Sequence, residues 1–331
     1  TIDKKYIDFF INVSSKAALA SSYFVGKKNK NAADQAAVDS MRAELNKINM
    51  NGKVVIGEGI LDEAPMLYTG ELLGNKNGPE FDIAVDPVEG TNFVANNLPG
   101  AISVIAMAEK GNLFNAPETY MDKIATGKVD KGLIDLDFPL KKNISNLADF
   151  MNKDISSITA CIMDRARHKS IIDELKSLNV KVKLITDGDV LGAVYVSNPK
   201  YNVDIFLGIG GGPEGVLAAS ALDAYNCHFQ GRFIFDNDKD INEARKMGII
   251  DLNKKYELNE IVKGDSIFCA TGITSSDVLS GIEIKDKNYI SETLVTHKDS
   301  DFKKIIKRVN IIKGWFLSQV KSGMKKKLTK I

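Results

Sequence analysis

Short apolar runs alternate with helical patterns through the second half of the chain, and this alternation constrains the fold more than any other feature. The apolar runs have the length of buried strands and cover residues 158–163, 181–185, 203–207 and 266–270. Helical patterns between them cover residues 170–178, 189–196 and 214–225. Since strands joined by crossover helices run parallel, this order predicts a parallel sheet covered by helices on both faces.

The first half of the chain combines a long helical region with a few strands. Residues 1–45 carry helical patterns, which the polar stretch 26–34 interrupts. Apolar runs at 54–56, 81–85 and 101–108 then predict strands. A polar stretch at 149–158 precedes the alternating half. We therefore expect an α/β protein with an α+β domain over residues 1–155 and an α/β domain over residues 156–331.

Composition excludes several classes of protein. Of 331 residues 44% are hydrophobic, which supports a sizeable core, and 44 Lys+Arg against 43 Asp+Glu argue against a general nucleic-acid binder. Three cysteines without CxxC spacing predict reduced thiols. No apolar run approaches the roughly 20 residues of a membrane span, and no signal peptide is recognisable. We expect a soluble cytoplasmic protein with neither nucleic acid nor membrane as a partner.

The last segment, residues 298–331, is strongly basic. It holds 11 Lys and Arg residues against two acids, Asp299 and Asp301. The pattern predicts a solvated terminal arm or helix face, and the alternative is an interface or a weak polyanion contact.

Acidic residues crowd into residues 58–89, which contain eight Asp and Glu and a single base, Lys76. Each acid alone is an ordinary surface residue, but several follow predicted strands, where α/β proteins bind ligands. Crowded like charges are costly unless a cation lies among them, and carboxylates suit hard cations such as Mg²⁺. The cluster therefore predicts a divalent-cation site that also organises a phosphate.

Within this cluster the sequence DPVEGT, residues 86–91, has a specific spacing. Asp86 and Glu89 lie three residues apart, Pro87 favours a turn and Gly90 permits a sharp reversal. The hydroxyl of Thr91 would then lie beside the metal-binding face and orient a water. The alternative is a capped turn that enters a loop.

A glycine-rich stretch, residues 210–212, follows a predicted strand and precedes Pro213 and Glu214. Pro213 suits a first helical turn, whose backbone N–H groups favour a phosphate, and Glu214 would carry its charge to a metal. A dinucleotide site also combines strand, glycines and helix, but Pro213 stands where its third glycine would be.

Arg165 and Arg167 follow the predicted strand at 158–163. Their guanidinium groups could bind a phosphate that is not cleaved; otherwise they are surface side chains. The histidines show no metal-ligand spacing and are interpreted as structural or incidental: His168, His228 and His297. Without a Gly-x-Ser-x-Gly motif or a Cys/His pairing, attack by water is expected rather than covalent catalysis.

Motifs spread in order along nearly the whole chain resemble those of one enzyme family. DPVEGT is similar to the Asp-Pro-(Ile/Leu)-Asp/Glu-Gly-Thr motif of the lithium-sensitive, metal-dependent sugar phosphatases. Narrower motifs resemble class II fructose-1,6-bisphosphatase, the bacterial glycerol-operon type: KNAAD at 30–34, VIGEG at 55–59, DEAPMLY at 62–68, NAPETYM at 115–121, RARH at 165–168, DGDV at 187–190, GGGPEG at 210–215, GR at 231–232 and ATGIT at 270–274.

The resemblance implies Mn²⁺ or Mg²⁺ as cofactor, with two or more ions per site. Asp34 and Glu58 would bind one ion, and the ligands of another would be Asp86, Glu89 and Glu214, with the backbone carbonyl of Val88. The implied catalytic residues are Thr91, Asp34, Glu58 and Lys30. Lys30 would lie near the phosphate; read alone, it is a solvated lysine in a lysine-rich loop.

The resemblance also implies a layered α-β-α-β-α sandwich of the sugar phosphatase type and a sugar bisphosphate as substrate. The implied substrate-binding residues are Glu89, Gly90, Thr91, Tyr120, Arg165, Ala166, Arg167, Asp187, Gly188, Asp189 and Gly211. The chain departs from the family pattern at Ile60 (often Glu), Asn92 (commonly Arg) and Arg165 (frequently Lys). Ile60 removes a carboxylate, which leaves the metal preference open.

The expected reaction is hydrolysis of the 1-phosphate of fructose 1,6-bisphosphate to fructose 6-phosphate, in gluconeogenesis and glycerol metabolism. Alternatives are sedoheptulose-1,7-bisphosphatase or inositol phosphatase activity. More remote alternatives are a dinucleotide-dependent enzyme and a non-catalytic sugar-phosphate sensor. We expect a homo-oligomer, either a dimer or a tetramer.

Overall fold

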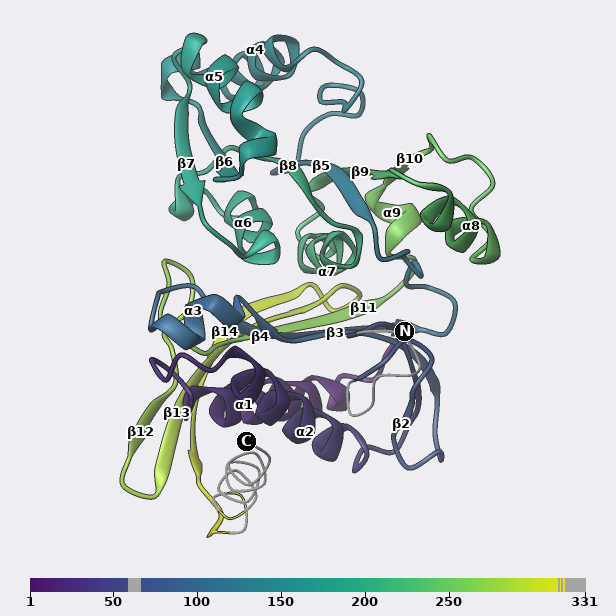
Figure 1. The fold of residues 1–331 in the computed structure, drawn as a ribbon, viewed down its shortest axis with the longest axis vertical. Helices are drawn as coiled ribbons and strands as arrows, with labels where there is room; N and C mark the ends of the chain where they lie inside the picture. Colours follow the sequence, from purple (N-terminus) through teal and green to yellow (C-terminus); the bar gives the residue numbers. More distant parts are fainter. Residues whose placement is uncertain (59–66, 315, 317, 319–331) are drawn as a thin grey trace. The chain divides into compact units, whose positions relative to one another are not determined.

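The chain divides into two units in the computed structural model, which describes residues 1–58, 67–314, 316 and 318 (Figure 1). Unit 1 comprises Thr1–Gly111 and Ile267–Ile331, and unit 2 comprises Asn112–Ser266. This division falls at 111/112 and 266/267 rather than at the predicted 155/156. The reason is that strands on both sides of residue 155 belong to the same hydrogen-bonded sheet.

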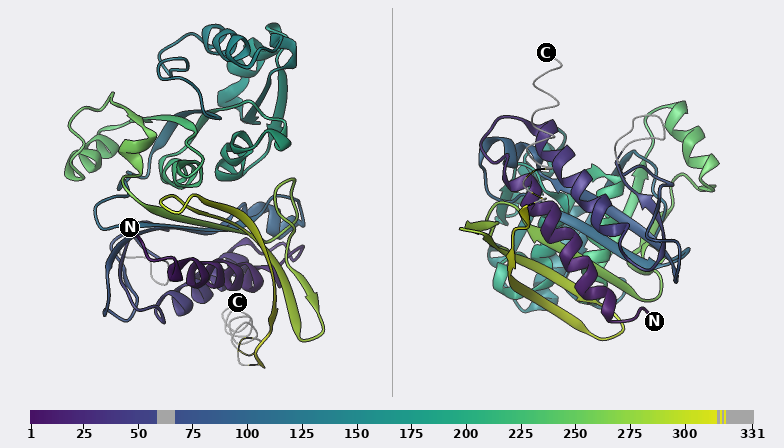
Figure 2. Two further views of the ribbon diagram at one scale, coloured as in Figure 1. Left: turned by 180° about the vertical axis from the view of Figure 1, so that it is seen from behind. Right: turned by 90° about the horizontal axis from the view of Figure 1, so that it is seen from below.

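In unit 1, helices α1 (Lys5–Ser22) and α2 (Lys30–Leu45) lie side by side over one face of a sheet (Figures 1 and 2). The side chain of Asn29 caps α2 by accepting a hydrogen bond from the backbone N–H of Ala32 at 2.9 Å. The predicted interruption therefore ends at Asn29, and Lys30 lies on the helix rather than in a loop. Apolar side chains of helices and sheet form the core, among them Phe10, Met41, Ile83, Met107 and Val295.

The sheet of unit 1 has the order β12-β13-β11-β4-β3-β1-β2, with β14 on β13. Its strands are β1 (Asn51–Ile56), β2 (Leu72–Leu73), β3 (Glu80–Glu89), β4 (Ile102–Glu109), β11 (Ser266–Gly272), β12 (Glu283–Lys285), β13 (Asn288–His297) and β14 (Phe302–Ile311). Helix α3 (Thr91–Asn96) follows β3. Strands β1 and β3 are parallel, whereas β11 pairs antiparallel with β13. The predicted strand at 266–270 therefore belongs here and not to a parallel sheet of the second half.

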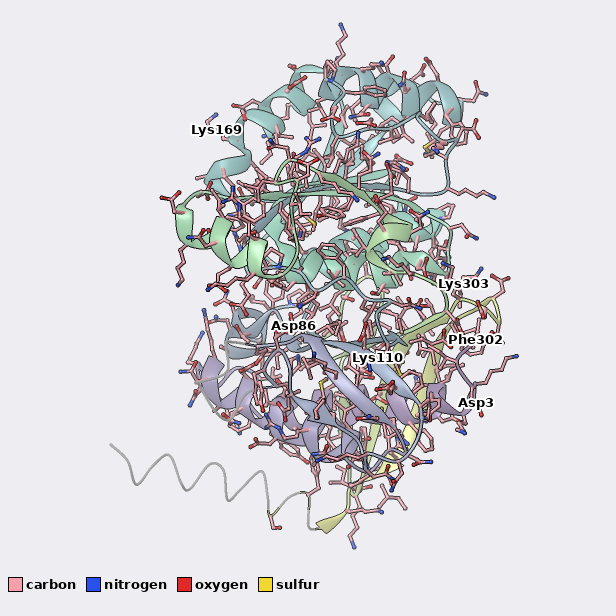
Figure 3. The ribbon with its side chains drawn as sticks, turned by 90° about the vertical axis from the view of Figure 1, so that its right-hand side faces the viewer. Asp3, Asp86, Lys110, Lys169, Phe302 and Lys303 are labelled. Atoms are coloured by element: carbon pink, nitrogen blue, oxygen red, sulfur yellow. The ribbon has the colours of Figure 1, made fainter. Side chains whose placement is uncertain are left out.

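Part of the basic C-terminal segment is a strand, which corrects the predicted arm or helix face. β14 pairs with β13 along its whole length, from Phe302 opposite His297 to Ile311 opposite Asn288. Figure 3 labels Phe302 and Lys303 at the start of this strand. The frequent lysines obscured a strand pattern, because long basic side chains are depleted from strands in general. Residues 319–331 of this segment lie outside the described residues.

Unit 2 contains a sheet with the order β10-β9-β5-β8-β6-β7. Its strands are β5 (Tyr120–Thr126), β6 (Thr159–Met163), β7 (Lys181–Ile185), β8 (Ile205–Gly211), β9 (His228–Ile234) and β10 (Lys255–Glu257). The predicted parallel arrangement holds for β7, β6 and β8. It is wrong for the rest, because β5 inserts between β8 and β9 and runs antiparallel to both.

Helices cover both faces of the unit 2 sheet, as predicted (Figure 1). The helices are α4 (Leu140–Met151), α5 (Lys169–Ser177), α6 (Asp189–Val194), α7 (Gly212–Asp223), α8 (Asp238–Lys246) and α9 (Leu258–Ile261), with short 3₁₀ turns η1 (Ile155–Ser157), η2 (Ala166–His168), η3 (Tyr195–Ser197) and η4 (Pro199–Tyr201). Helices α4 and α5 bury Ile144, Leu147 and Leu175 against Ile162 and Leu207 of the sheet.

These observations confirm the α/β class. The five-layer order concerns both units together and stays a prediction. Cys161, Cys227 and Cys269 are all buried and form no disulfide. Within the described residues, no helix has the length and apolarity needed to span a bilayer.

Candidate active site

Three acidic side chains of unit 1 converge from three different elements. Asp34 lies on α2, Glu58 follows the end of β1, and Asp86, labelled in Figure 3, lies on β3. A side-chain hydrogen bond joins Glu58 to Asp34, and the charges of Asp34 and Asp86 both act on Glu58. Glu58 therefore lies beside Asp34 and within range of the charge of Asp86, and all three are predicted metal ligands.

The environment of Glu58 disfavours its charged form. Burial, followed by the charges of Asp34 and Asp86, raises the pKa of Glu58 to about 9. One carboxyl oxygen, Oε2, is buried without a hydrogen-bond partner. A hydrogen bond between two carboxyl groups requires a proton on one of them, which agrees with the raised pKa of Glu58.

This donor set fits a hard divalent cation. All donors are oxygens, and a cation would offset the repulsion that raises the pKa of Glu58. No group of three or more His, Cys, Asp or Glu side chains in the described part of the chain already stands in a metal-binding arrangement.

Strand β3 continues through residues 86–89 of the DPVEGT sequence, which corrects the turn predicted at Pro87. The register between β3 and β4 shifts between Asp86 and Glu89, which marks a bulge. Pairing of β3 with β1 has already ended at Ala84, so the missing N–H of Pro87 costs no bond on that side. Because the strand continues across this bulge, Asp86 and Glu89 both lie in the last four residues of β3.

The chain reverses immediately after this bulge. Gly90 adopts a φ of +85°, and Thr91 is the first residue of α3. Val88 and Glu89 are buried, with exposed fractions of 3% and 5%, while Thr91 is half-buried. Lys30 is exposed and lies one helical turn before Asp34 on α2. Ile60, Asp62 and Glu63 lie outside the described residues.

In unit 2, the predicted substrate residues Tyr120 and Arg167 lie together. The guanidinium carbon of Arg167 lies 4.9 Å from the centre of the Tyr120 ring, and its Nε donates to the carbonyl oxygen of Ile209 at 2.9 Å. Arg165 is half-buried and donates from Nη1 to the carbonyl of Asp164 at 3.3 Å. Ala166, between the two arginines, is exposed.

Asp189 has a partner that the sequence analysis missed. Its carboxylate forms a buried ion pair with Lys123 of β5, and Nζ of Lys123 also donates to the carbonyl oxygen of Gly211 at 2.8 Å. Lys123 shares the buried face of β5 with Met121 and Ala125. A lysine on the apolar face of a strand requires a buried acid, so this pattern indicates that Lys123 has a partner, although it does not identify Asp189.

The predicted residues beside Asp189 form a tight turn. The backbone N–H of Gly188 donates to Oδ1 of Asp187 at 3.0 Å, and Gly188 adopts a φ of +91° before α6 begins. Asp187 is half-buried, so its carboxylate remains the better placed of the two acids for a substrate hydroxyl.

The glycines of the β8–α7 turn make room for two carboxylates. A Cβ on Gly210 would lie 2.0 Å from Oδ2 of Asp189, and a Cβ on Gly211 would lie 1.7 Å from Oε2 of Glu214. Two carboxylates against this turn are unfavourable for the pyrophosphate of a dinucleotide, which weakens that alternative. Glu214 belongs to unit 2, whereas the other predicted metal ligands belong to unit 1.

Comparison with known proteins adds independent evidence. The family model "Bacterial fructose-1,6-bisphosphatase, glpX-encoded" matches residues 5–310. A relative from Prochlorococcus marinus (strain MIT 9515), named D-fructose 1,6-bisphosphatase class 2/sedoheptulose 1,7-bisphosphatase, is 39% identical over 314 residues, which are 90% of this chain and 94% of the relative. A relative of the same name from Synechococcus sp. (strain JA-2-3B'a(2-13)) is 38% identical over 329 residues, 92% of this chain and 95% of the relative.

Among solved structures, an inositol monophosphatase from Anabaena (Nostoc) sp. PCC 7120 covers 59% of this chain and 71% of that chain, with 13% identity and a TM-score of 0.31. The family model and the two sequence relatives decide the assignment. The chain belongs to the bacterial, glpX-encoded fructose-1,6-bisphosphatase family, a family of phosphatases, as its motifs predicted.

Proposed function

We propose that this protein hydrolyses the 1-phosphate of fructose 1,6-bisphosphate to give fructose 6-phosphate and phosphate. The observation that carries the proposal is the family match over residues 5–310, together with relatives of about 39% identity that are named for this activity. The cluster of Asp34, Glu58 and Asp86 supports the chemistry, because phosphoryl transfer needs positive charge close to the phosphate and carboxylates can hold it there.

Divalent cations, Mn²⁺ or Mg²⁺, are the cofactors that these residues fit. The residues that would hold them are Asp34, Glu58, Asp86, Glu89 and Glu214, with the carbonyl of Val88. Bound cations would polarise a phosphoryl oxygen of the substrate and lower the pKa of a water molecule. The buried Oε2 of Glu58, without a hydrogen-bond partner, supports this fit.

The side chains at the end of β3 would handle the water. Thr91, at the start of α3, would hold and orient the attacking water through its hydroxyl, and a neighbouring carboxylate would accept its proton. Lys30, exposed and one helical turn from Asp34, would hold the phosphate that is cleaved.

The residues of unit 2 would hold the rest of the substrate. Arg167 and Tyr120, already in contact, would bind the phosphate that is not cleaved, with Arg165 beside them. Asp187 would accept a hydrogen bond from a sugar hydroxyl. Asp189 would act indirectly, because its carboxylate is engaged by Lys123.

A second candidate substrate is sedoheptulose 1,7-bisphosphate, which the names of both relatives favour. It carries the same two phosphate groups on a longer sugar, so the same residues would bind it. The ratio of kcat/KM for the two bisphosphates would rank them.

The test is a phosphate-release assay with purified protein and Mn²⁺ over both bisphosphates and inositol 1-phosphate. We expect turnover of fructose 1,6-bisphosphate with fructose 6-phosphate as the product, identified by enzymes specific for that isomer. Glu58→Gln should abolish turnover, while the exposed Glu283→Gln serves as control and should behave like the wild type. Fructose 1-phosphate as product, or no turnover above the metal-free blank, would contradict the proposal.

A further inference from the structure

Strand β8 extends beyond the end of its neighbour β6. The two strands pair at Ile205 and Phe206, whereas β8 continues to Gly211. In the part of β8 beyond β6, the backbone N–H and C=O groups that face away from β5 need other partners, since unpaired polar groups are costly when buried. Ile209 finds them in two consecutive side chains of η2: its N–H donates to Nε2 of His168 at 2.8 Å, and its carbonyl accepts from Nε of Arg167 at 2.9 Å.

His168 is built into this connection. It has no exposed surface, and its Nδ1 lies 2.7 Å from the carbonyl oxygen of Met163 at the end of β6. Because Nε2 accepts a hydrogen bond, the single proton of the neutral ring is on Nδ1, which donates to Met163. A Cβ on Gly208 would lie 3.0 Å from Nε2, so the ring lies directly against the strand.

Arg167 is exposed, yet it is held in one orientation. Its bond to Ile209 and its contact with Tyr120 both depend on where η2 lies relative to β8. A free arginine side chain loses conformational entropy on binding, and prior orientation removes part of that cost. His168, the residue next to Arg167, supplies the buried bond between η2 and β8.

We propose that His168 is a positioning residue for the substrate: it fixes η2 against β8, so that Arg167 presents its guanidinium group beside Tyr120. This inference rests on the proposed function, in which Arg167 binds the phosphate that is not cleaved. Loss of the His168–Ile209 bond should therefore weaken substrate binding and leave the chemical step almost unchanged. A residue that merely stabilised the fold would alter the melting temperature without this split.

Two substitutions separate the two hydrogen bonds of His168. Asparagine retains a donor near the position of Nδ1 but does not reach Ile209, whereas glutamine places an amide oxygen near the position of Nε2. We expect His168→Asn to raise KM about tenfold with kcat within twofold of the wild type, and His168→Gln to return KM to within about threefold. His297→Asn is the matched control, because His297 is also buried and its Nδ1 lies 2.8 Å from Ser300 Oγ in unit 1.

A double variant tests whether His168 acts through Arg167. His168→Asn in an Arg167→Ala background should leave KM at the value of Arg167→Ala alone. Equal KM values for the wild type, His168→Asn and His168→Gln would overturn the inference, as would a fully additive double variant.

Nuclear magnetic resonance tests the inference without turnover, so that it is separable from the proposed function. In the wild type and in His168→Gln, the Nε–H of Arg167 and the amide of Ile209 should exchange slowly with water. In His168→Asn both should exchange at least tenfold faster. Unchanged exchange would refute the positioning role, whereas a wild type with protected protons but no bisphosphatase activity would refute the proposed function alone.

Discussion

Removing the ammonium group of Lys123 should strongly destabilise unit 2. Lys123 is 1% exposed and Asp189 is 6% exposed, so Lys123→Met leaves the Asp189 carboxylate buried without its counter-ion. It also removes the donor to the carbonyl oxygen of Gly211. Removing one partner of a buried pair costs about 3–5 kcal/mol. For a unit of this length, 1 kcal/mol corresponds to roughly 2–4 °C in Tm, so we expect a decrease of about 6–20 °C.

Calorimetric melting of three variants measures this effect. Lys123→Met is compared with Lys123→Met/Asp189→Asn, which removes both charges and should recover more than half of the lost Tm. Lys153→Met is the control, because Lys153 pairs with Asp204 at 2.8 Å in the same unit but its side chain is 38% exposed. The same chemical change there should cost no more than about 1 kcal/mol.

Two results would refute this reasoning. A double variant no more stable than Lys123→Met would show that the loss comes from packing and not from a stranded charge. A Tm for Lys123→Met within about 2 °C of the wild type would show that the Asp189 carboxylate is solvated in solution, and that the ion pair does not hold β5 to α6.

Three further predictions concern the candidate site. Burial and neighbouring charges raise the pKa of Glu58 to about 9 in the folded protein, whereas its ordinary pKa in an unfolded chain is 4.5. The metal-free wild type should therefore lose Tm as pH rises from about 5 to 9, and Glu58→Gln should not show this slope. Gly210→Ala, whose Cβ would lie 2.0 Å from Oδ2 of Asp189, should lower Tm by several degrees in calorimetry, and an unchanged Tm would argue against the contact. In steady-state assays, Thr91→Ala should lower kcat at least about 100-fold and leave KM within threefold of the wild type. Thr91→Ser, which keeps the hydroxyl, should retain most activity. Equal kcat values for Thr91→Ala and the wild type would exclude the hydroxyl from the mechanism.

Local elements with a strong apolar pattern were predictable from the sequence. β6, β7 and the helices between the parallel strands lie within a few residues of their predicted ranges, because β6 buries a continuous apolar run and α5 an apolar stripe. β7 was expected to be a buried strand, but it is the edge strand of its sheet and none of its residues is buried. β1, β3 and β4 were also predicted, although β3 extends four residues further, through Glu89. The bulge at Pro87 explains this error, since a proline in an apolar run usually marks a strand end.

Pairing between distant segments was not predictable in the same way. The sequence of β5 contains an aspartate and a lysine among its seven residues, YMDKIAT, which hid the strand that makes the sheet mixed. Its place between β8 and β9 depends on contacts across about 90 and 110 residues of chain, as in the pairs of Met121 with Gly210 and Phe233. Local periodicity carries no information on such pairings.

The candidate site shows the same contrast. Glu58 and Asp86 could be predicted to belong to one acidic cluster, because both follow predicted strands and crowded like charges need a cation. Asp34, on α2, was expected as a metal ligand only from the resemblance to the family. Lys123 could not be predicted as a partner of Asp189 without knowing that β5 lies beside β8. His168 was interpreted as structural or incidental, because its contact with Ile209 depends on where β6 stops pairing with β8.

The end of β8 explains why the substrate residues predicted for unit 2 are so widely spaced in the sequence. Ile209, Gly210 and Gly211 are contacted from four other elements: His168 and Arg167 of η2, Asp189 of α6, Lys123 of β5 and Glu214 of α7. Each of these residues contacts one of three consecutive backbone positions, so each limits the positions that the others can take. Substitutions among them should therefore be non-additive in both stability and substrate affinity, whereas two independent roles, in folding and in binding, would give additive effects.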